Sequence, residues 1–259
     1  MENPHAPAER PRRAHLSLQG LSLGDAFGQQ FFLRTALLER LIAERALPGP
    51  PWPFTDDTQR ALSVVGSLAR FGHIDQDWLA RSFAEQYTSE RGYGPAMHGL
   101  LREIGDGADW RAAAAAQFGG QGSFGNGAAM RVAPLGAYFA DDLDLLVDQA
   151  TRSAEVTHTH HEGIAGAVAV AVAAGLAWHA GRTGSRLEPD DFLELVAERV
   201  PASEGRDGIR RARRLGVGCP IRQLARPYDS TGNRAWKIAD TRVLQAVVSR
   251  VINGAGVPT

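Results

Sequence analysis

The sequence has a single cysteine, Cys219, so no disulfide can form within the chain. This fits the reducing conditions of the cytoplasm, where we expect the protein to reside. An excess of one charge is also lacking, since 28 basic and 29 acidic residues give a formal net charge of -1. Such a balance creates no general field to attract nucleic acid or an anionic membrane, so an anionic ligand must be held by local groups.

Long hydrophobic runs are lacking as well. The most apolar segment, residues 164–177, is rich in Ala and Gly, and it is too short and too weakly apolar to span a bilayer. Residues 1–13 contain no apolar stretch of the length found in signal peptides. We therefore expect a soluble protein without a membrane partner, and a disordered tail over residues 1–13.

Alternating apolar and polar residues, the pattern of strands, are scarce. Alanine is abundant instead, and apolar residues recur at spacings of three and four, as in Leu62, Val65 and Leu68. The lack of alternating strand and helix patterns argues against a Rossmann-like sheet. The sequence predicts an all-α fold with one domain over residues 14–259. No clear period marks residues 216–237, and helices are expected near 21–46, 58–71, 76–88, 95–104, 126–139, 141–155, 162–181, 189–199, 205–215 and 239–252.

A hydroxyl and two carboxylates precede an apolar helix at Thr55, Asp56 and Asp57. One interpretation is local: Thr55 caps free N–H groups of the helix, and the carboxylates interact favourably with the positive end of its dipole. The other is a metal site, because Mg²⁺, Mn²⁺ and Ca²⁺ favour hard oxygen ligands, whereas Zn²⁺ usually takes His and Cys. Both can hold at once, since a capping residue can also ligate a metal.

Two glycines, Gly24 and Gly28, stand near Asp25 within an apolar run. Glycine inside a helix costs about 1 kcal/mol relative to alanine, which indicates close packing or the close approach of a ligand. A carboxylate in an apolar setting needs a partner, such as a backbone N–H, a cation or a metal-bound water. Tight helix packing explains the glycines equally well.

A glycine-rich stretch, residues 122–131, reads Gly-Ser-Phe-Gly-Asn-Gly-Ala-Ala-Met-Arg and runs into a predicted helix. Backbone N–H groups in such a loop, next to a helix N-terminus, can bind phosphate. The stretch is not a P-loop, because it lacks the Gly-Lys-Ser/Thr ending. Composition alone is also consistent with a merely flexible loop.

Three histidines, His158, His160 and His161, precede the next predicted helix. They do not indicate zinc, because there is no His-Glu-x-x-His spacing and no cysteine nearby. They are either solvated residues at a helix start, or His158 and His160 face a ligand pocket.

The order of these motifs is more specific than any one of them. Gly-Asp-Ala-x-Gly, Thr-Asp-Asp-Thr, Gly-Asn-Gly-Ala-Ala-Met-Arg and Thr-His-x-His follow one another as in the ADP-ribosylglycohydrolase family, which the chain resembles over about residues 14–180. Within that family it resembles the bacterial branch related to the dinitrogenase reductase-activating glycohydrolases. The resemblance implies an orthogonal helical bundle with a dinuclear Mg²⁺ or Mn²⁺ centre. It also implies hydrolysis of the glycosidic bond to ADP-ribose, in an ADP-ribosylated protein or a small molecule that contains ADP-ribose.

The resemblance also assigns roles to individual residues. It implies that Thr55, Asp56 and Asp57 ligate metal, with Asp56 and Asp57 as catalytic residues. As a hypothesis, Asp57 accepts the proton of the attacking water. Asp25 is expected to support the first helix near the metals, and the ADP-ribose pocket is expected to include Gly125, Asn126, Gly127, Met130, Arg131 and His158.

One motif of the family is not found in this chain. A C-terminal Gly-Asp-x-Asp-Thr completes the two-metal site in the family, but here the only carboxylates after position 220 are Asp229 and Asp240. Gln29 and Gln30 stand where related proteins often have an acidic residue. Water would then have to complete the coordination of an Mg²⁺-like ion. The alternatives are single or weak metal binding, a catalytically impaired module that binds ADP-ribose, and a purely structural helical protein.

Overall fold

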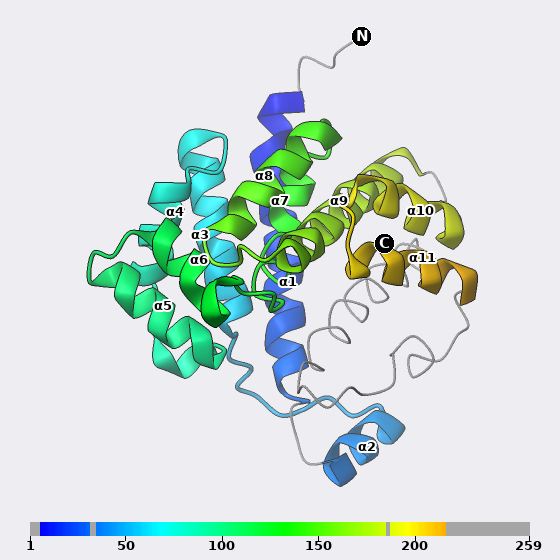
Figure 1. Cartoon of the computed structure of the whole chain (residues 1–259). Coiled ribbons are helices and arrows are strands. Elements are labelled where there is room, and N and C mark those ends of the chain that lie inside the picture. Colours follow the sequence, from blue (N-terminus) through cyan, green and yellow to red (C-terminus); the bar gives the residue numbers. More distant parts are fainter. Residues whose placement is uncertain (1–5, 32–34, 185–186, 216–259) are drawn as a thin grey trace.

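The structure is a computed structural model that describes residues 6–31, 35–184 and 187–215. All regular structure within these residues is helical, which confirms the predicted all-α fold (Figure 1). The elements are α1 (Ala6–Gln29), α2 (Thr35–Glu44), α3 (Asp56–Phe71), α4 (Gln76–Glu85), the 3₁₀ helix η1 (Ser89–Arg91), α5 (Pro95–Gly105), α6 (Trp110–Gly120), α7 (Ala133–Tyr138), α8 (Leu143–Glu155), α9 (His161–Thr183), α10 (Pro189–Arg199) and α11 (Glu204–Leu215).

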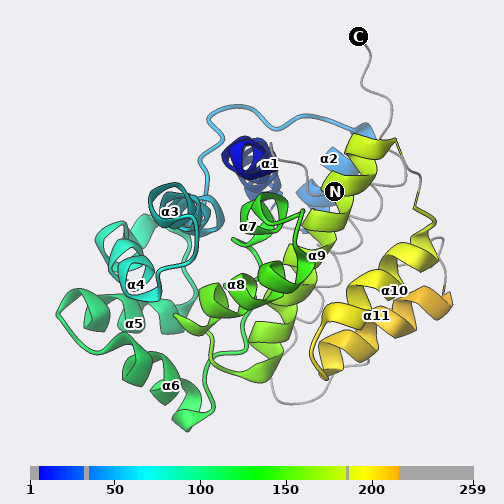
Figure 2. The same cartoon turned by 90° about the horizontal axis from the view of Figure 1, so that it is seen from above.

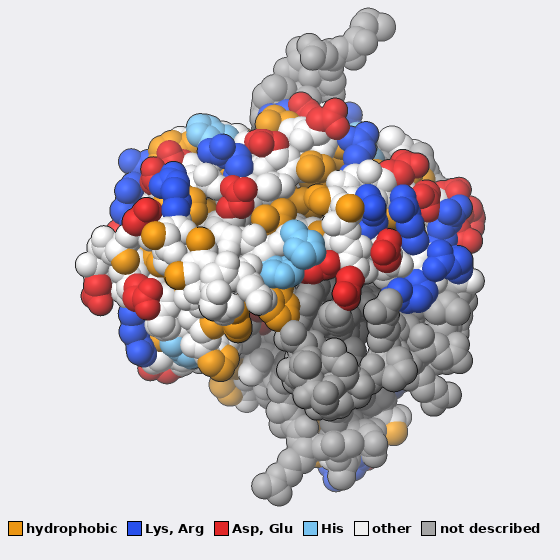
Figure 3. Space-filling view, viewed as in Figure 1, with side chains coloured by type: hydrophobic (Ala, Val, Ile, Leu, Met, Phe, Trp, Pro, Cys, Tyr) orange, Lys and Arg blue, Asp and Glu red, His pale blue; other side chains and the backbone are white. Residues whose placement is uncertain are grey.

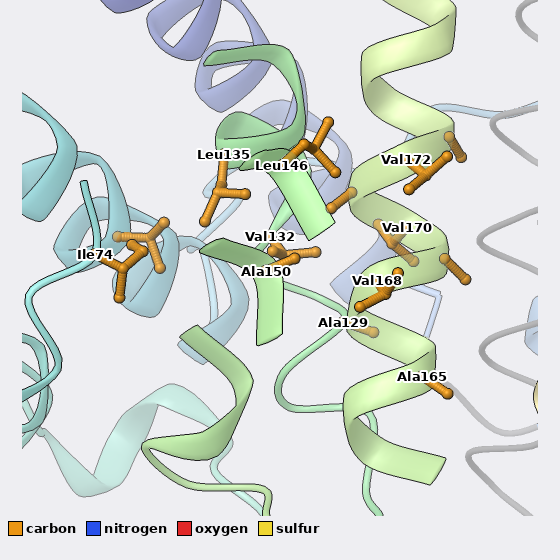
Figure 4. Packing of buried hydrophobic residues seen from close by; sticks show 14 of the residues in the cluster. Ile74, Ala129, Val132, Leu135, Leu146, Ala150, Ala165, Val168, Val170 and Val172 are labelled. Carbon is orange, nitrogen blue, oxygen red and sulfur yellow. The ribbon is translucent and has the colours of Figure 1, made fainter. Parts of the chain in front are cut away.

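Helix α9 is the central helix of the fold. Helices α7 and α8 pack against it, and so do α10 and α11 (Figures 1 and 2). Its sequence is dominated by Ala, Val and Gly, so α9 is apolar all round, as expected for a helix buried on several faces. Figure 4 shows Val168, Val170 and Val172 of α9 in one cluster with Leu146 and Ala150 of α8.

Helix α9 is long and apolar enough to cross a membrane when judged by length and composition alone, since it spans 23 residues. However, 67% of its most apolar window is buried inside the fold. Core helices of soluble proteins pass the same test, and the four helices packed around α9 give it the surroundings of a core helix. The predicted helix over residues 162–181 is confirmed, with bounds of His161–Thr183.

Side chains at the helix starts explain several boundaries. Asp75 accepts a hydrogen bond from the backbone N–H of Trp78 at 2.8 Å at the start of α4, and Asp142 accepts one from Leu145 at 3.0 Å at the start of α8. These caps satisfy N–H groups that have no partner inside the helix. Helix α3 ends where Gly72 takes a left-handed conformation with φ of 74°.

Residues 6–13 are helical, so the predicted disordered tail is wrong for this part of the chain. Helix α1 begins at Ala6, and both Arg10 and Arg13 pair with Asp141 at 2.6 Å. Asp141 lies in the turn between α7 and α8, so the two cations fasten the start of α1 to the body of the fold. A composition rich in Pro, Ala and Arg favours disorder, but it cannot reveal an acidic partner far along the chain.

Two other predicted helices have different limits. The predicted helix over residues 21–46 is two helices, because α1 ends at Gln29 and α2 runs from Thr35 to Glu44. Residues 126–131 form turns, and only Ala133–Tyr138 of the predicted 126–139 helix is helical. Helix α6 was not predicted beyond a helical turn. The predicted helix at 239–252 and the unassigned stretch at 216–237 lie outside the described residues.

The start of α11 is capped by a carboxylate from another helix. Glu162, in the first turn of α9, accepts hydrogen bonds from the backbone N–H groups of Glu204 at 2.6 Å and Gly205 at 3.1 Å. Farther along α11, Arg213 pairs with Glu194 of α10 at 2.7 Å. These contacts lie in the region where Figure 3 shows basic side chains gathered over α10 and α11.

Helices α7 and α9 approach each other closely at Gly136. A Cβ atom at this position would lie 2.1 Å from the carbonyl oxygen of Ala171 on α9. Real Cβ atoms do not come this close to a backbone atom, so any side chain at Gly136 would force the two helices apart.

We expect Gly136→Ala to lower the free energy of unfolding by about 1–3 kcal/mol, the usual cost of overpacking a core. Gly99→Ala is the matched control, since Gly99 lies within α5 and an added Cβ meets nothing within 4 Å. This control should be neutral, or should raise the stability by up to about 1 kcal/mol. Urea denaturation measures the free energy of unfolding of both variants and of wild type. Unchanged stability of Gly136→Ala would show that α7 and α9 separate at no cost.

Candidate active site

Asp25 of α1 binds the beginning of α3. Its carboxylate accepts hydrogen bonds from the backbone N–H and the hydroxyl of Thr55, at 2.8 and 2.6 Å. It also accepts hydrogen bonds from the N–H and the hydroxyl of Thr58, at 3.3 and 2.6 Å. These four donors are the partner that a carboxylate in an apolar run needs. The structure therefore places Asp25 beside the Thr-Asp-Asp motif, where it supports the start of α3.

Asp56 and Asp57 form the first turn of α3, next to Asp25. Asp56 is only 8% exposed, and its burial raises the pKa of its carboxyl group. Burial raises the pKa of Asp57 to about 7, and the negative charges of Asp56 and Asp25 add to this shift. Carboxylates are usually found this close together where a cation or a shared proton offsets their repulsion.

The chemistry of this donor set fits one end of a Mg²⁺ or Mn²⁺ site. The hydroxyl of Thr55 donates to Asp25 and accepts from the N–H of Asp57 at 3.3 Å, so Thr55 caps α3 and keeps an oxygen lone pair for a metal. Within the described part of the chain, no three His, Cys, Asp or Glu residues are grouped so as to hold a metal ion. Metal ligation by Thr55, Asp56 and Asp57 therefore stays a prediction.

The glycine loop, defined here as residues 122–127, packs against the histidine segment before α9. Gly122 has φ of +75°, and a Cβ on it would lie 2.1 Å from the hydroxyl of Thr159. A Cβ on Gly127 would lie 2.7 Å from Cε1 of His158. Asn126 lies within the loop, and its carbonyl accepts the N–H of Ala129 and of Met130 at 2.9 and 3.0 Å, so the chain leaves the loop in a turn. Glycine is thus required where the loop meets His158 and Thr159.

Arg131 lies beneath the glycine loop and is completely buried. Its guanidinium donates to the carbonyl of Gly127 and the hydroxyl of Thr157, both at 3.0 Å, and to the carbonyl of Ser153 at 2.6 Å. These bonds join the loop to the end of α8 and to the segment before α9. The structure gives Arg131 the role of bracing the loop, and its predicted contact with ADP-ribose stays a prediction.

His158 is 2% exposed, and its Nδ1 is hydrogen-bonded to the hydroxyl of Thr157 at 2.7 Å. Burial, helped by the positive charges of Arg131 and Arg60, holds the pKa of His158 well below its ordinary value. The ring is therefore neutral at neutral pH. Of the three histidines, only His161 is exposed, and Figure 3 shows histidine side chains on the surface where α9 begins.

An aromatic cluster next to the glycine loop was not predicted. Phe118 is 53% exposed and adopts a left-handed conformation with φ of 53°, which ends the regular part of α6. Its ring lies 5.8 Å from that of Phe124, and the Phe124 ring lies 5.0 Å from that of His160. The signal in the sequence is a phenylalanine on each side of a run of glycines, but nothing there shows that the rings meet.

The all-helical fold, the acidic start of α3 and the glycine loop are the features that a comparison with known protein families can test. The family model described as ADP-ribosylglycohydrolase matches residues 6–251. The chain therefore belongs to the ADP-ribosylglycohydrolase family, as its motif order predicts. The narrower resemblance to the dinitrogenase reductase-activating branch stays a prediction.

Relatives place the chain within this family. It is 33% identical to ADP-ribosylhydrolase ARH3 of Gallus gallus over 226 residues, which is 80% of this chain and 60% of the relative. It is 30% identical to ADP-ribosylhydrolase ARH3 of Homo sapiens over 256 residues, which is 92% of this chain and 67% of the relative. A solved structure described as an ADP-ribosylglycohydrolase-related protein complex covers 96% of this chain and 91% of its own, with a TM-score of 0.52 and 21% identity. That likeness supports the fold alone.

The low pKa of His158 predicts a pH dependence of stability. Below pH ~6.5 the unfolded chain binds a proton on this residue that the folded protein excludes, so the free energy of unfolding falls as the pH decreases. Between pH 7 and pH 5, wild type should lose up to about 1.4 kcal/mol per pH unit more than His158→Gln. Urea denaturation at each pH measures this difference. Parallel slopes would mean that folded His158 takes up the proton.

Proposed function

We propose that this chain is a metal-dependent hydrolase that cleaves the glycosidic bond of ADP-ribosylated substrates. The observation that carries the proposal is the meeting of the acidic start of α3 with the glycine loop. Burial raises the pKa of Asp56, and Arg60, one turn later in α3, lies close enough for its charge to offset part of this rise. Its Nη1 also lies 3.1 Å from the position of a Cβ on Gly127. Arg60 thus lies near both the carboxylates and the glycine loop, which supports a single site with an acidic part and a loop of the kind that binds phosphate.

In this proposal the glycine loop, the aromatic rings and the carboxylates each bind a different part of ADP-ribose. The glycine loop offers backbone N–H groups of the kind that hold a diphosphate. Phe124 of the loop and the neighbouring Phe118 are both partly accessible, and an adenine base could stack there. The carboxylates of Asp56 and Asp57 then lie toward the ribose, where the bond is cleaved. Family membership supports this class of substrate.

Hydrolysis at the anomeric carbon passes through an oxocarbenium-like state and needs an activated water. When bound, Mg²⁺ or Mn²⁺ supplies the Lewis acidity that favours ionisation of water at neutral pH. Thr55, Asp56 and Asp57 would hold the ion. In this proposal the carboxylate of Asp57 accepts the proton of the attacking water, while Asp25 keeps the first turn of α3 in place.

A second candidate function is ADP-ribose binding without hydrolysis. It is favoured by one observation, the lack of three His, Cys, Asp or Glu residues placed to ligate a metal within residues 6–31, 35–184 and 187–215. A chain with only part of the metal site would keep the glycine loop and the aromatic cluster, and would bind ADP-ribose without turnover.

Asp57→Asn separates these two functions. If Asp57 accepts the proton, the variant should release ADP-ribose from an ADP-ribosylated peptide about 10²–10⁴-fold more slowly with Mn²⁺ present. Its affinity for ADP-ribose should stay close to that of wild type. Asp106→Asn is the control, since Asp106 is exposed at the end of α5, and it should keep full activity. Chromatography of released ADP-ribose measures the rate, and isothermal titration measures the affinity.

Two outcomes would change the conclusion. Full Mn²⁺-dependent activity of Asp57→Asn would show that Asp57 is not the proton acceptor. Binding of ADP-ribose by wild type, with no release of ADP-ribose in Mn²⁺ or Mg²⁺, would support the binding module in place of the hydrolase.

Phe118→Ala tests the adenine position. Stacking of a base on an aromatic side chain contributes about 1–3 kcal/mol, so the variant should bind ADP-ribose roughly tenfold more weakly or worse. Ribose-5-phosphate, which has no base, should bind both proteins equally. Leu62→Ala removes a side chain of similar exposure, 49%, from α3, and should leave both affinities unchanged. An unaltered affinity of Phe118→Ala for ADP-ribose would place the adenine elsewhere.

A further inference from the structure

Arg60 is a buried charge whose presence the fold does not explain. Its side chain is 1% exposed. No carboxylate forms an ion pair with it among the described residues, and the charges of Asp56 and Asp57 only partly offset the burial that lowers its pKa. Nη2 contacts the sulfur of Met97 at 3.4 Å, and the guanidinium lies over the rings of Phe83 and Tyr93 at 4.9 and 5.8 Å. Its Nε and Nη1 are buried without a hydrogen-bond partner. A buried donor in this state is costly and calls for a specific reason.

Arg131 provides the contrast. It is equally buried and contacts the same Phe83 ring at 4.5 Å. Its Nε also lacks a partner, but its Nη1 and Nη2 both donate, to Gly127, Thr157 and Ser153. Burial lowers the pKa of Arg131, and the charge of Arg60 lowers it further, because the two cations repel each other. Buried charges that lack a partner do not stabilise a fold. Bracing the loop explains Arg131, whereas Arg60 adds charge and makes none of these bonds.

The unpartnered Nη1 of Arg60 faces the glycine loop from beneath. A Cβ on Gly127 would lie 3.1 Å from this atom and 2.9 Å from Nε2 of His158. Only the missing side chain of Gly127 lets both nitrogen atoms approach the loop so closely. The ring of His158 is neutral, so the positive charge at this point comes from the arginines. Arg60 therefore puts a cation directly behind backbone that is suited to hold phosphate.

We propose that Arg60 is a positioning residue for a diphosphate group, and that its buried charge strengthens the binding of that group on the glycine loop. The inference rests on the proposed function, because it takes the diphosphate to be that of ADP-ribose. Asp56 and Asp57 lie close enough to Arg60 for their charges to act on it, so its positive charge also reduces their repulsion of an anionic ligand. In a water-poor interior the charge acts through the loop without touching the ligand.

The test compares three ligands that share parts of ADP-ribose: ADP-ribose itself, ADP, and adenosine, which has no phosphate. Isothermal titration measures the affinity of each ligand for wild type, Arg60→Met and Arg60→Lys at one salt concentration. We expect Arg60→Met to weaken the binding of ADP-ribose and of ADP by about 10-fold to 100-fold. Its affinity for adenosine should be unchanged. Arg60→Lys should recover most of the loss. Arg70→Met is the matched control, since Arg70 is exposed on the same helix, and it should bind as wild type does.

Thermal unfolding provides a readout that separates function from structure. Because methionine fills the space without an unpaired charge, Arg60→Met should melt at the same temperature as wild type or higher. If this variant does not fold, Arg60→Gln removes the charge while keeping a polar end, and carries the same comparison of ligands.

Several outcomes would overturn the inference. Equal affinity of wild type and Arg60→Met for ADP-ribose overturns it while leaving the proposed function intact. An equal loss of affinity for adenosine also overturns it, because the effect would then come from altered shape and not from charge. If wild type does not bind ADP-ribose, the proposed function fails instead, and pyrophosphate becomes the probe. If wild type binds pyrophosphate and Arg60→Met binds it more weakly, the inferred role of the Arg60 charge is upheld. If wild type does not bind pyrophosphate, the inference is overturned.

Discussion

The structure depends on a single carboxylate that gathers four donors from another helix. Asp25 takes hydrogen bonds from the backbone and the hydroxyls of Thr55 and Thr58, so α1 determines where α3 starts. Asp25 satisfies the N–H groups of Thr55 and Thr58, so the side chains of Asp56 and Asp57 are not needed to cap these two donors. The opposite end of α1 is held by Asp141 through two arginines. The first helix is thus fixed at both ends, and the acidic turn of α3 inherits its position.

Charge is sorted by sign within the site. Negative groups lie at the start of α3, while the buried cations Arg60 and Arg131 lie under the glycine loop, with neutral His158 against the same loop. Burial makes each of these charges act more strongly than it would in water. A ligand with an anionic middle and an uncharged sugar at one end would match this order of charges. The proposed substrate class has that distribution, which links the electrostatics of the fold to the family that the sequence belongs to.

The sequence predicted the helical class, the family and the nearness of Asp25 to the Thr-Asp-Asp turn, because each rests on local periodicity or on a family pattern. It did not reveal Arg60, since one arginine in an amphipathic helix resembles any solvated residue until its neighbours are known. The exposed position of Phe118 was not predicted for a related reason, because it follows from a left-handed backbone conformation at the end of α6. The tail was mispredicted because Arg10 and Arg13 find their partner well over a hundred residues away.

The capping of α11 by Glu162 has a consequence for how this part of the chain acquires its shape. Two glycines and several like-charged arginines make α11 a poor helix by itself, so the cap of its first turn comes from Glu162 at the start of α9. Glu162 follows directly after the histidines that pack on the glycine loop. The start of α11 is therefore tied, through Glu162, to the segment that packs on the glycine loop.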